Sequence, residues 1–218
     1  QVGGSNPPGV ASLSFRALFV TDDFPLFLAD LDTTRDHSFE LLTKAVRIRR
    51  SPMHTPVVST IAQDGRPRAR IVVLRAFDRE HLQLRFHTDI RSDKFHELQA
   101  DHRIALSFYD AEQKIQLRIE GHASLHRNDH IADAAWASSQ AMSKLCYAIE
   151  PGPGHIITAR DDFFLPRDRS ESETGRAHFA AVIVTIEELD FLWLGAAGNR
   201  RAVYRFVEQN IDARWVVP

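Results

Sequence analysis

Between residues 56 and 126 the chain alternates apolar and polar residues in short runs, as strands with one buried face do. In residues 81–88, Leu82, Leu84 and Phe86 fall on one side of the expected strand and polar residues on the other. Asp64-Gly65 separates two such runs and is a common hairpin turn. The pattern therefore predicts antiparallel strands joined by short turns.

The same criteria place further strands after residue 126. We expect strands at 56–62, 68–77, 81–88, 103–110, 114–126, one or two within 177–195, and at 200–207 and 213–218. Short strands at close spacing with few helices favour a mainly β (α+β) fold, an antiparallel barrel with flanking helices. Alternating βαβ units are absent from the sequence, which disfavours a parallel nucleotide-binding sheet.

The remaining segments predict helices and exposed connections. Helical spacing indicates helices at 24–31, at about 38–49 with Ser38 as N-cap, from Ser92 to about residue 99, and at 129–147. Residues 160–176 are dominated by Asp, Arg, Ser and Glu, and we expect them to be exposed and mobile. Residues 1–14 are rich in Gly, Pro and Ser, which predicts a mobile tail before a single domain at 15–218.

Composition narrows the class of function. The apolar fraction of 44% and charged fraction of 26% are those of a globular protein, and a net charge of −2 provides no overall basic field for nucleic acid or anionic lipid. No apolar run approaches the roughly 18 residues of a membrane span. Cys146 is the only cysteine, and the N-terminal residues lack the order of a signal peptide. We therefore expect a cytoplasmic protein without nucleic-acid or membrane partners.

Several polar residues between positions 70 and 121 could form an anion site. Ser92 and Lys94 fall at a helix start, where free backbone N–H groups can hold an anion, and nearby Arg70 and Arg75 could add bidentate contacts. Gln116 could hydrogen-bond a polar ring edge. From spacing alone the plainer interpretation is favoured: solvated cations, Ser92 as a helix cap and Gln116 exposed. The eleven histidines show no paired-ligand spacing, so no metal site is predicted.

Ordered segments of the chain resemble the pyridoxamine 5'-phosphate oxidase family. They are Arg70-Ile-Val-Val-Leu-Arg75, Phe86-His-Thr88-Asp, Arg91-Ser92-Asp-Lys94 and Gln116-Leu-Arg-Ile-Glu-Gly121, followed by Arg201-x-x-x-Arg205-Phe206 and Trp215-x-x-Pro218. The resemblance covers roughly residues 38–126 and 177–218. It implies an FMN-binding split β-barrel that forms a homodimer, with FMN at the subunit interface.

The resemblance also implies roles for individual residues. Arg70, Ser92 and Lys94 would bind the FMN phosphate end, while Arg75, in place of the usual Lys, and Gln116 would lie near the flavin ring. Asp93 stands where Arg is common, and His87 replaces a Tyr. The implied cofactor-binding set is Arg70, Ile71, Val72, Val73, Leu74, Arg75, His87, Thr88, Ser92, Lys94, Gln116, Trp193 and Arg205, and the implied substrate-binding residues are Arg75 and Arg201.

The leading hypothesis is an FMN-dependent oxidoreductase, oxidase or reductase, with a small-molecule substrate. The alternatives are a true pyridoxamine/pyridoxine 5'-phosphate oxidase, a flavin-binding protein without efficient turnover, and a dimeric interaction module. No catalytic side chain is assigned.

The sequence disfavours pyridoxamine 5'-phosphate as the substrate. Family oxidases hold its phosphate with a Tyr, an Arg and a Ser spaced four apart after the Gln-bearing strand, whereas gapless counting from Gln116 puts Ala134, Ser138 and Met142 there. A shifted register would bring Arg127 or Lys144 in instead. Val203 also replaces the His of an Arg-x-His motif that begins at Arg201.

Overall fold

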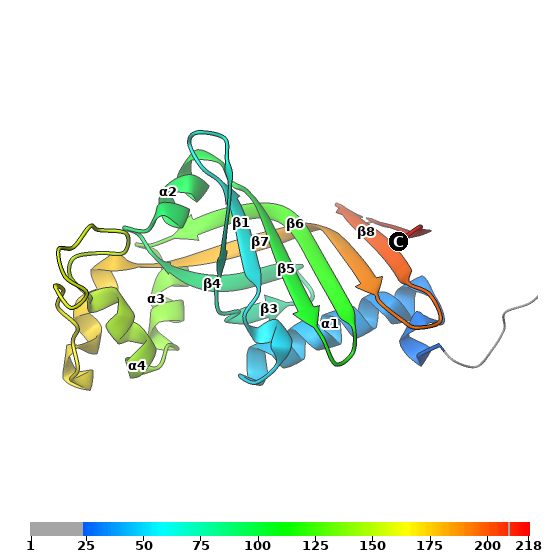
Figure 1. The fold of residues 1–218 in the computed structure, drawn as a ribbon, viewed down its shortest axis with the longest axis horizontal. Helices are drawn as coiled ribbons and strands as arrows, with labels where there is room; N and C mark the ends of the chain where they lie inside the picture. Colours follow the sequence, from blue (N-terminus) through cyan, green and yellow to red (C-terminus); the bar gives the residue numbers. More distant parts are fainter. Residues whose placement is uncertain (1–23, 209) are drawn as a thin grey trace, which may run out of the picture.

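The computed structural model describes residues 24–208 and 210–218, so the expected tail at 1–14 lies outside the described residues. Nine strands form one antiparallel sheet in the order β2-β1-β5-β6-β7-β4-β3, with β8 and β9 continuing from β7 (Figure 1). The strands are β1 (Val57–Ile61), β2 (Pro67–Ile71), β3 (Ala76–Asp78), β4 (Gln83–Asp89), β5 (Arg103–Asp110), β6 (Ile115–His126), β7 (Phe179–Trp193), β8 (Arg200–Val207) and β9 (Asn210–Val216). The predicted antiparallel, barrel-like fold class is confirmed.

The segment 72–75 joins the two ends of the sheet into a barrel. The amides of Val72 and Leu74 donate to Pro56 O and His54 O at 3.0 and 2.9 Å, and the Arg75 amide donates to Arg85 O at 2.7 Å. The prediction of a single strand at 68–77 is therefore wrong in detail, because β2 and β3 are separate strands. Residues 72–75, called the bridge below, connect them and pass from the β1 side to β4.

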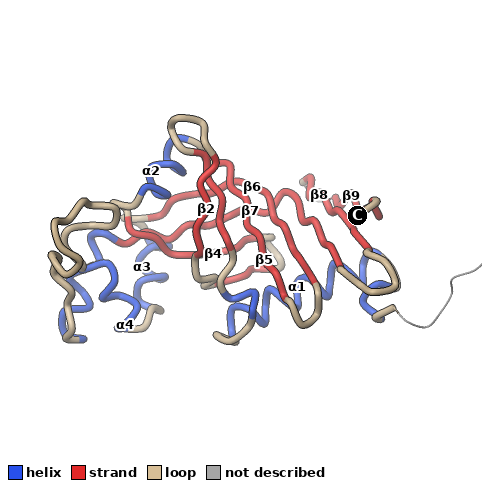
Figure 2. Tube along the Cα trace, viewed as in Figure 1, coloured by secondary structure: helices blue, strands red, loops and turns tan. Residues whose placement is uncertain are grey.

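Helix α1 (Leu31–Arg47) runs along the underside of the barrel (Figure 2) and begins earlier than the sequence predicted. Its N-cap is Asp30, whose carboxylate accepts from the Thr33 amide at 2.7 Å. Ser38, the predicted N-cap, is buried within the helix and donates to Thr34 O at 2.9 Å. The helix predicted at 24–31 is only a short 3₁₀ turn, Leu26–Leu28.

The other helices lie at the opposite end of the barrel or above it. Helix α2 (Asp93–Ala100) follows Ser92 as predicted, whereas the helix predicted at 129–147 is broken into α3 (His130–Ala137) and α4 (Ala141–Lys144), followed by a 3₁₀ turn at Leu145–Ala148. At the break, the hydroxyls of Ser138 and Ser139 both donate to Ala135 O. Such side-chain bonds compete with helical ones and favour an end at this point. A further 3₁₀ helix, Arg169–His178, leads into β7.

The core fills the barrel and the space between it and α1. Alternate residues of β6 and β7 point inward, and Leu117, Ile119, Leu189 and Phe191 are fully buried. A bulge after Glu120 leaves no room beside Gly121, where an added Cβ would lie 1.9 Å from Thr185 O. Within the described residues, no helix is both long enough and apolar enough to cross a membrane.

Candidate functional site

A buried cluster of hydroxyls and a lysine lies where β4 passes into α2. Ser92 Oγ donates to Asp89 O at 2.7 Å and lies 3.0 Å from Thr88 Oγ1, and the Lys94 ammonium donates to Thr88 Oγ1 at 3.2 Å and to Ser92 Oγ at 3.4 Å. Burial, and secondly the nearby charge of Arg70, lower the pKa of Lys94. A partly buried ammonium whose direct partners among the described residues are hydroxyls is suited to an anionic ligand.

Arg70 lies beside this cluster but is partly neutralised. Its guanidinium donates to Glu97 Oε2 at 2.7 Å and also to Thr60 Oγ1, while Thr60 Oγ1 donates to the same carboxylate oxygen at 2.5 Å. Burial tends to raise the pKa of Glu97, but its bonds to Thr60 and Arg70 outweigh this and the net direction is down. Glu97 therefore stays ionised and fixes the direction of Arg70.

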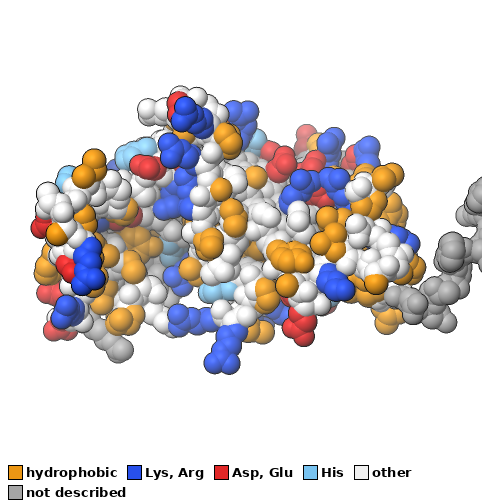
Figure 3. All heavy atoms as spheres, in the orientation of Figure 1, with side chains coloured by type: hydrophobic (Ala, Val, Ile, Leu, Met, Phe, Trp, Pro, Cys, Tyr) orange, Lys and Arg blue, Asp and Glu red, His pale blue; other side chains and the backbone are white. Residues whose placement is uncertain are grey.

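The protein also has a cavity of about 490 Å³ near the end of α1. Its wall combines the end of α1, the bridge at 72–75, the outer face of β4 and the broken helix at 138–143. The lining residues are Val46, Arg47, Arg49, His54, Thr55, Val73, Leu74, Arg75, Arg85, His87, Ser138, Ser139, Gln140 and Ser143. The space-filling view shows this region as a hollow between the α3–α4 lobe and the barrel (Figure 3).

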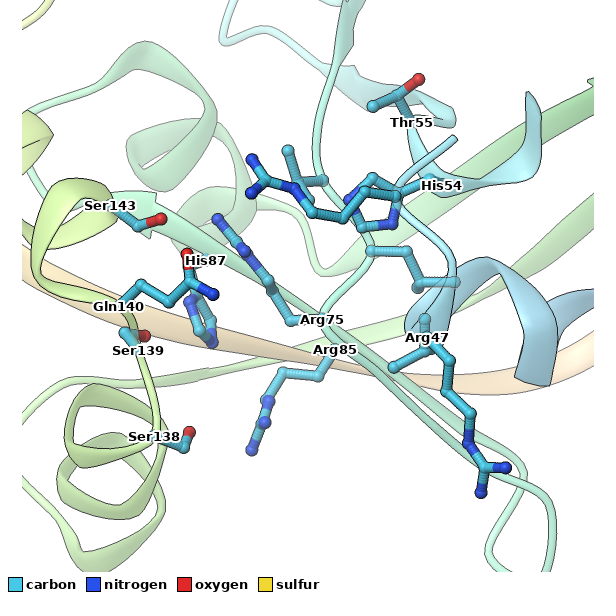
Figure 4. Close-up of a pocket in the computed structure, with 14 residues that line it drawn as sticks. Arg47, His54, Thr55, Arg75, Arg85, His87, Ser138, Ser139, Gln140 and Ser143 are labelled. Atoms are coloured by element: carbon cyan, nitrogen blue, oxygen red, sulfur yellow. The ribbon is translucent and has the colours of Figure 1, made fainter. Parts of the chain in front are cut away.

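Two arginines and a histidine extend into the cavity, and their side chains make no hydrogen bond to a described residue. Figure 4 shows Arg75, Arg85 and His87 facing the segment 138–143, with Arg47 pointing away. The Nε atoms of both inward arginines and Nε2 of His87 are buried and make no hydrogen bond to any described residue. Burial, followed by the charges of the two arginines, lowers the pKa of His87 to about 3, so its imidazole is neutral near pH 7. Burial and then Arg75 also lower the pKa of Arg85.

The expected site residues fall into two groups within one protomer. Arg70, Thr88, Ser92 and Lys94 form the buried cluster just described, and the bridge with Arg75 and His87 lines or borders the cavity. Gln116, Trp193, Arg201 and Arg205 lie elsewhere, on β6, β7 and β8.

The second group has other partners in the protomer. Trp193 is buried in the core against Phe24, with ring centroids 5.9 Å apart. Arg205 pairs with Glu188 at 2.8 Å, and Arg201 pairs with Asp190 at 2.7 Å. Gln116 is partly exposed on the outer face of β6. The structure therefore does not bring this group to the cavity of the same protomer.

Sequence reasoning missed Arg85, Glu97, Ser139 and Ser143, whereas it named Ser138. Arg85 alternates with the buried Leu84 and Phe86, which made it look like an ordinary solvated residue. Glu97 lies 27 residues from Arg70, and nothing local marks the pair. The run Ser138-Ser139-Gln140 was the available signal for the break, because serines and glutamine there interrupt an alanine-rich helix.

Comparison with known proteins defines the class of this site. Residues 37–127 match the model of the pyridoxamine 5'-phosphate oxidase FMN-binding domain, a stretch that includes the bridge, the Lys94 cluster and Gln116. The Lys94 ammonium and the hydroxyls of Thr88 and Ser92 fit a phosphate-bearing cofactor. Residues 37–127, about two fifths of the chain, are thus similar to the FMN-binding domain of the pyridoxamine 5'-phosphate oxidase family, a domain whose cofactor is FMN.

Curated relatives are similar over part of the chain. Pyridoxine/pyridoxamine 5'-phosphate oxidase of Rubrobacter xylanophilus is 37% identical over 89 residues, 41% of this chain and 40% of that protein. The chain therefore spans about two fifths of this relative. The oxidase of Hydrogenovibrio crunogenus is 34% identical over 61% of this chain and 60% of that protein. The oxidase of Cupriavidus pinatubonensis is 27% identical over 80% and 82%.

Solved structures share the fold. The pyridoxamine 5'-phosphate oxidase-related FMN-binding protein of Nostoc punctiforme superposes with a TM-score of 0.66 at 20% identity, covering 84% of this chain and 96% of that chain. PhzG of Burkholderia lata, solved in complex with tetrahydrophenazine-1-carboxylic acid, gives 0.67 at 17% identity, covering 90% and 98%. At these identities the likeness concerns the architecture alone.

Proposed function

We propose that the protein is an FMN-dependent oxidoreductase that works as a homodimer on a small molecule other than pyridoxamine 5'-phosphate. The observation that carries this proposal is that one segment, residues 70–75, contributes Arg70 to the surroundings of Lys94 and Arg75 to the lining of the cavity. FMN, when bound, exchanges a pair of electrons with a substrate. The protein has to bind the cofactor, orient it and admit the substrate to one face.

The FMN phosphate would be held by Lys94, Thr88, Ser92 and Arg70. Charged and hydroxyl donors there are already desolvated and mutually oriented, so binding requires little reordering. The bridge at 72–75 would run along the flavin ring, because its residues line the neighbouring cavity. Arg75 would lie near enough to stabilise negative charge on the reduced ring.

The position of Gln116 supports the proposed homodimer. Strand register places Arg70 opposite buried Val58, on the inner face, whereas Gln116 pairs with exposed Tyr109 on the outer face. The two are also three strands apart, about 14 Å at the usual strand spacing. One flavin can contact both only if Gln116 comes from a second copy.

The outer face is suited to that contact. Val57 and Ile71 pair across β1 and β2, and both are exposed, as is Tyr109 on β5. Apolar side chains grouped on one side of a sheet are typical of a protein interface. A second protomer packed there would bring its own Gln116 toward the flavin.

Pyridoxamine 5'-phosphate fits the cavity poorly. Of the positions expected to hold its phosphate, Ser138 lines the cavity, whereas Ala134 is exposed on α3 and Met142 is exposed on α4. Lys144, the alternative cation, pairs with Glu173 at 2.6 Å and does not line the cavity. A phosphate at that end would therefore lack a cation from this segment.

The test is FMN retention in the purified protein and in Arg70→Ala and Lys94→Ala. Loss of one charged hydrogen bond to phosphate costs on the order of 1.5–3 kcal/mol, so each variant should bind FMN roughly ten- to a hundredfold more weakly. Arg66→Ala is the matched control, because Arg66 is exposed in the β1–β2 turn. Unchanged FMN affinity in both variants would refute this placement of the phosphate. Reduction of the bound flavin by NADPH or by amine donors then tests turnover.

A further inference from the structure

The carboxylate of Glu97 is buried on α2 beside the cations that we assign to the FMN phosphate. Its side chain binds through one oxygen, Oε2, which accepts from the Arg70 guanidinium at 2.7 Å and from Thr60 Oγ1 at 2.5 Å. The other oxygen, Oε1, makes no hydrogen bond to a described residue. Glu97 therefore orients Arg70 and at the same time neutralises its charge.

Glu97 is one of three carboxylates near the Lys94 ammonium. Burial lowers the pKa of Lys94, and the three negative charges oppose that change: Asp89, Glu97 and Asp93. Asp89 is already bound by Arg91, which donates to its two carboxylate oxygens at 2.9 and 2.7 Å. Asp93 is exposed and forms no ion pair with a described residue. Glu97 and Asp93 are therefore the negative charges that a ligand bound at Lys94 would meet.

These carboxylates oppose the ligand that the cations attract. A phosphate monoester carries about −1.5 to −2 charges near neutral pH. Lys94 and Arg70 provide two positive charges, and Glu97 and Asp93 provide two negative ones, so the four side chains together contribute no net positive charge. Repulsion between like charges a few ångströms apart is strong where water is partly excluded, as it is beside buried Glu97. A phosphate bound here would be held more weakly than its cationic and hydroxyl partners alone would allow.

We propose that Glu97, with the exposed Asp93, lowers the affinity of this site for the FMN phosphate, so that FMN exchanges with free flavin faster than it would without these carboxylates. This inference rests on the proposed function, which places the phosphate beside Arg70 and Lys94. Glu97 is thereby a specificity-determining residue, because it sets how strongly the site distinguishes FMN from riboflavin, which lacks the phosphate.

The experiment measures the affinity of the wild type and of Glu97→Gln for FMN and for riboflavin by equilibrium ultrafiltration near neutral pH. Glutamine keeps the length of the side chain and an oxygen that can accept from Arg70 and Thr60, but it removes the charge. FMN should bind about tenfold more tightly to the variant and leave it more slowly by a similar factor. Riboflavin affinity should not change.

Two further variants accompany Glu97→Gln. Asp93→Asn leaves the Glu97 contacts in place and should tighten FMN binding by about threefold, because the charge that it removes is exposed and screened by salt. Glu80→Gln is the matched control, since Glu80 is exposed in the turn between β3 and β4. This control should bind both flavins as the wild type does.

Thermal unfolding separates this effect from a purely structural one. Without flavin, Glu97→Gln should unfold at a lower temperature than the wild type, because it loses a charged hydrogen bond to Arg70. Saturating FMN should then raise the unfolding temperature of the variant more than that of the wild type. Lower stability combined with unchanged or weaker FMN binding would show that Glu97 only holds Arg70 in place, and would overturn the inference.

The outcomes distinguish this inference from the proposed function. Equal tightening of FMN and riboflavin binding in Glu97→Gln overturns the inference, because the effect would not then depend on the phosphate. If Glu97→Gln does not fold, unchanged FMN affinity in Asp93→Asn overturns it. Loss of FMN from Arg70→Ala and Lys94→Ala, with wild-type affinity in both carboxylate variants, overturns the inference and leaves the proposed function standing. Wild-type FMN affinity in Arg70→Ala and Lys94→Ala refutes the placement of the phosphate itself.

Discussion

The substitution His87→Gln tests, through protein stability alone, whether the surroundings of His87 keep its imidazole uncharged. The imidazole lies on the outer side of β4, with its ring 4.8 Å from that of Phe179 and its Nε2 buried without a described partner. Burial first, then Arg85 and Arg75, disfavour the charged form and lower its pKa from 6.5 to about 3. Glutamine keeps a polar side chain of similar reach but cannot take up a proton at these pH values.

The direction of the effect follows from proton binding. Between pH 6.5 and about 3 the unfolded chain binds a proton at His87 that the folded protein does not, so acid favours unfolding across that window. At pH 4.5 the gap from the unfolded pKa is about two units, or about 2.7 kcal/mol at 1.36 kcal/mol per unit. The glutamine variant lacks this penalty.

Urea unfolding of wild type and His87→Gln at a series of pH values from about 7.5 to about 4.5 measures the effect. The free energy of unfolding of the variant, minus that of the wild type, should rise by about 2.7 kcal/mol as pH falls. Other titrating groups are common to both proteins and largely cancel. His96→Gln, on the exposed side of α2, controls for loss of an imidazole. A difference that stays constant with pH would show that His87 is not held neutral by its surroundings.

Two further predictions concern assembly and substrate. Sedimentation of the wild type at micromolar concentration should show an FMN-loaded dimer. The substitution Tyr109→Glu, on the exposed outer face, should convert the dimer to a monomer and release the flavin. A stable flavin-loaded wild-type monomer would contradict the assignment of Gln116 to a second copy. With pyridoxamine 5'-phosphate under air, hydrogen peroxide release should stay below about 0.1 per second, whereas faster turnover with micromolar KM would identify a true oxidase.

The parts of the fold that depend on local pattern were predictable. Strict alternation in β4, β5 and β6 located these strands within a residue or two, since one face of each packs on the core. Three members of the Lys94 cluster, Thr88, Ser92 and Lys94, could also be located from the sequence, because they fall within seven residues around a strand-to-helix turn. The start of α1 was missed because Asp30 was not recognised as its cap, although its carboxylate satisfies the Thr33 amide.

The parts that depend on distant contacts were not predictable. The bridge at 72–75 has strand-like composition, and only its bonds to residues 54, 56 and 85 turn it into a barrel closure. Arg85 becomes partly buried because residues 138–143, more than fifty positions away, form the opposite wall. Alternation alone assigns such a residue to solvent. Arg85, which the alternating pattern predicts to be solvent-exposed, therefore lines a cavity because a segment distant in the sequence covers it.

The Lys94 cluster and the cavity differ in whether acidic residues lie near their cations, and this difference bears on substrate specificity. Near Lys94, Glu97 pairs with Arg70 and Asp93 stands where the related family commonly has Arg, so acidic residues lie beside the cluster that we propose for the FMN phosphate. In the cavity the reverse holds, since Arg75 and Arg85 have no acidic neighbour among the lining residues. Related oxidases hold the substrate phosphate with residues of the helix after the Gln-bearing strand, whereas in this protein the cations Arg75 and Arg85 extend from the β3–β4 side. A change of substrate within the same fold is the expected consequence.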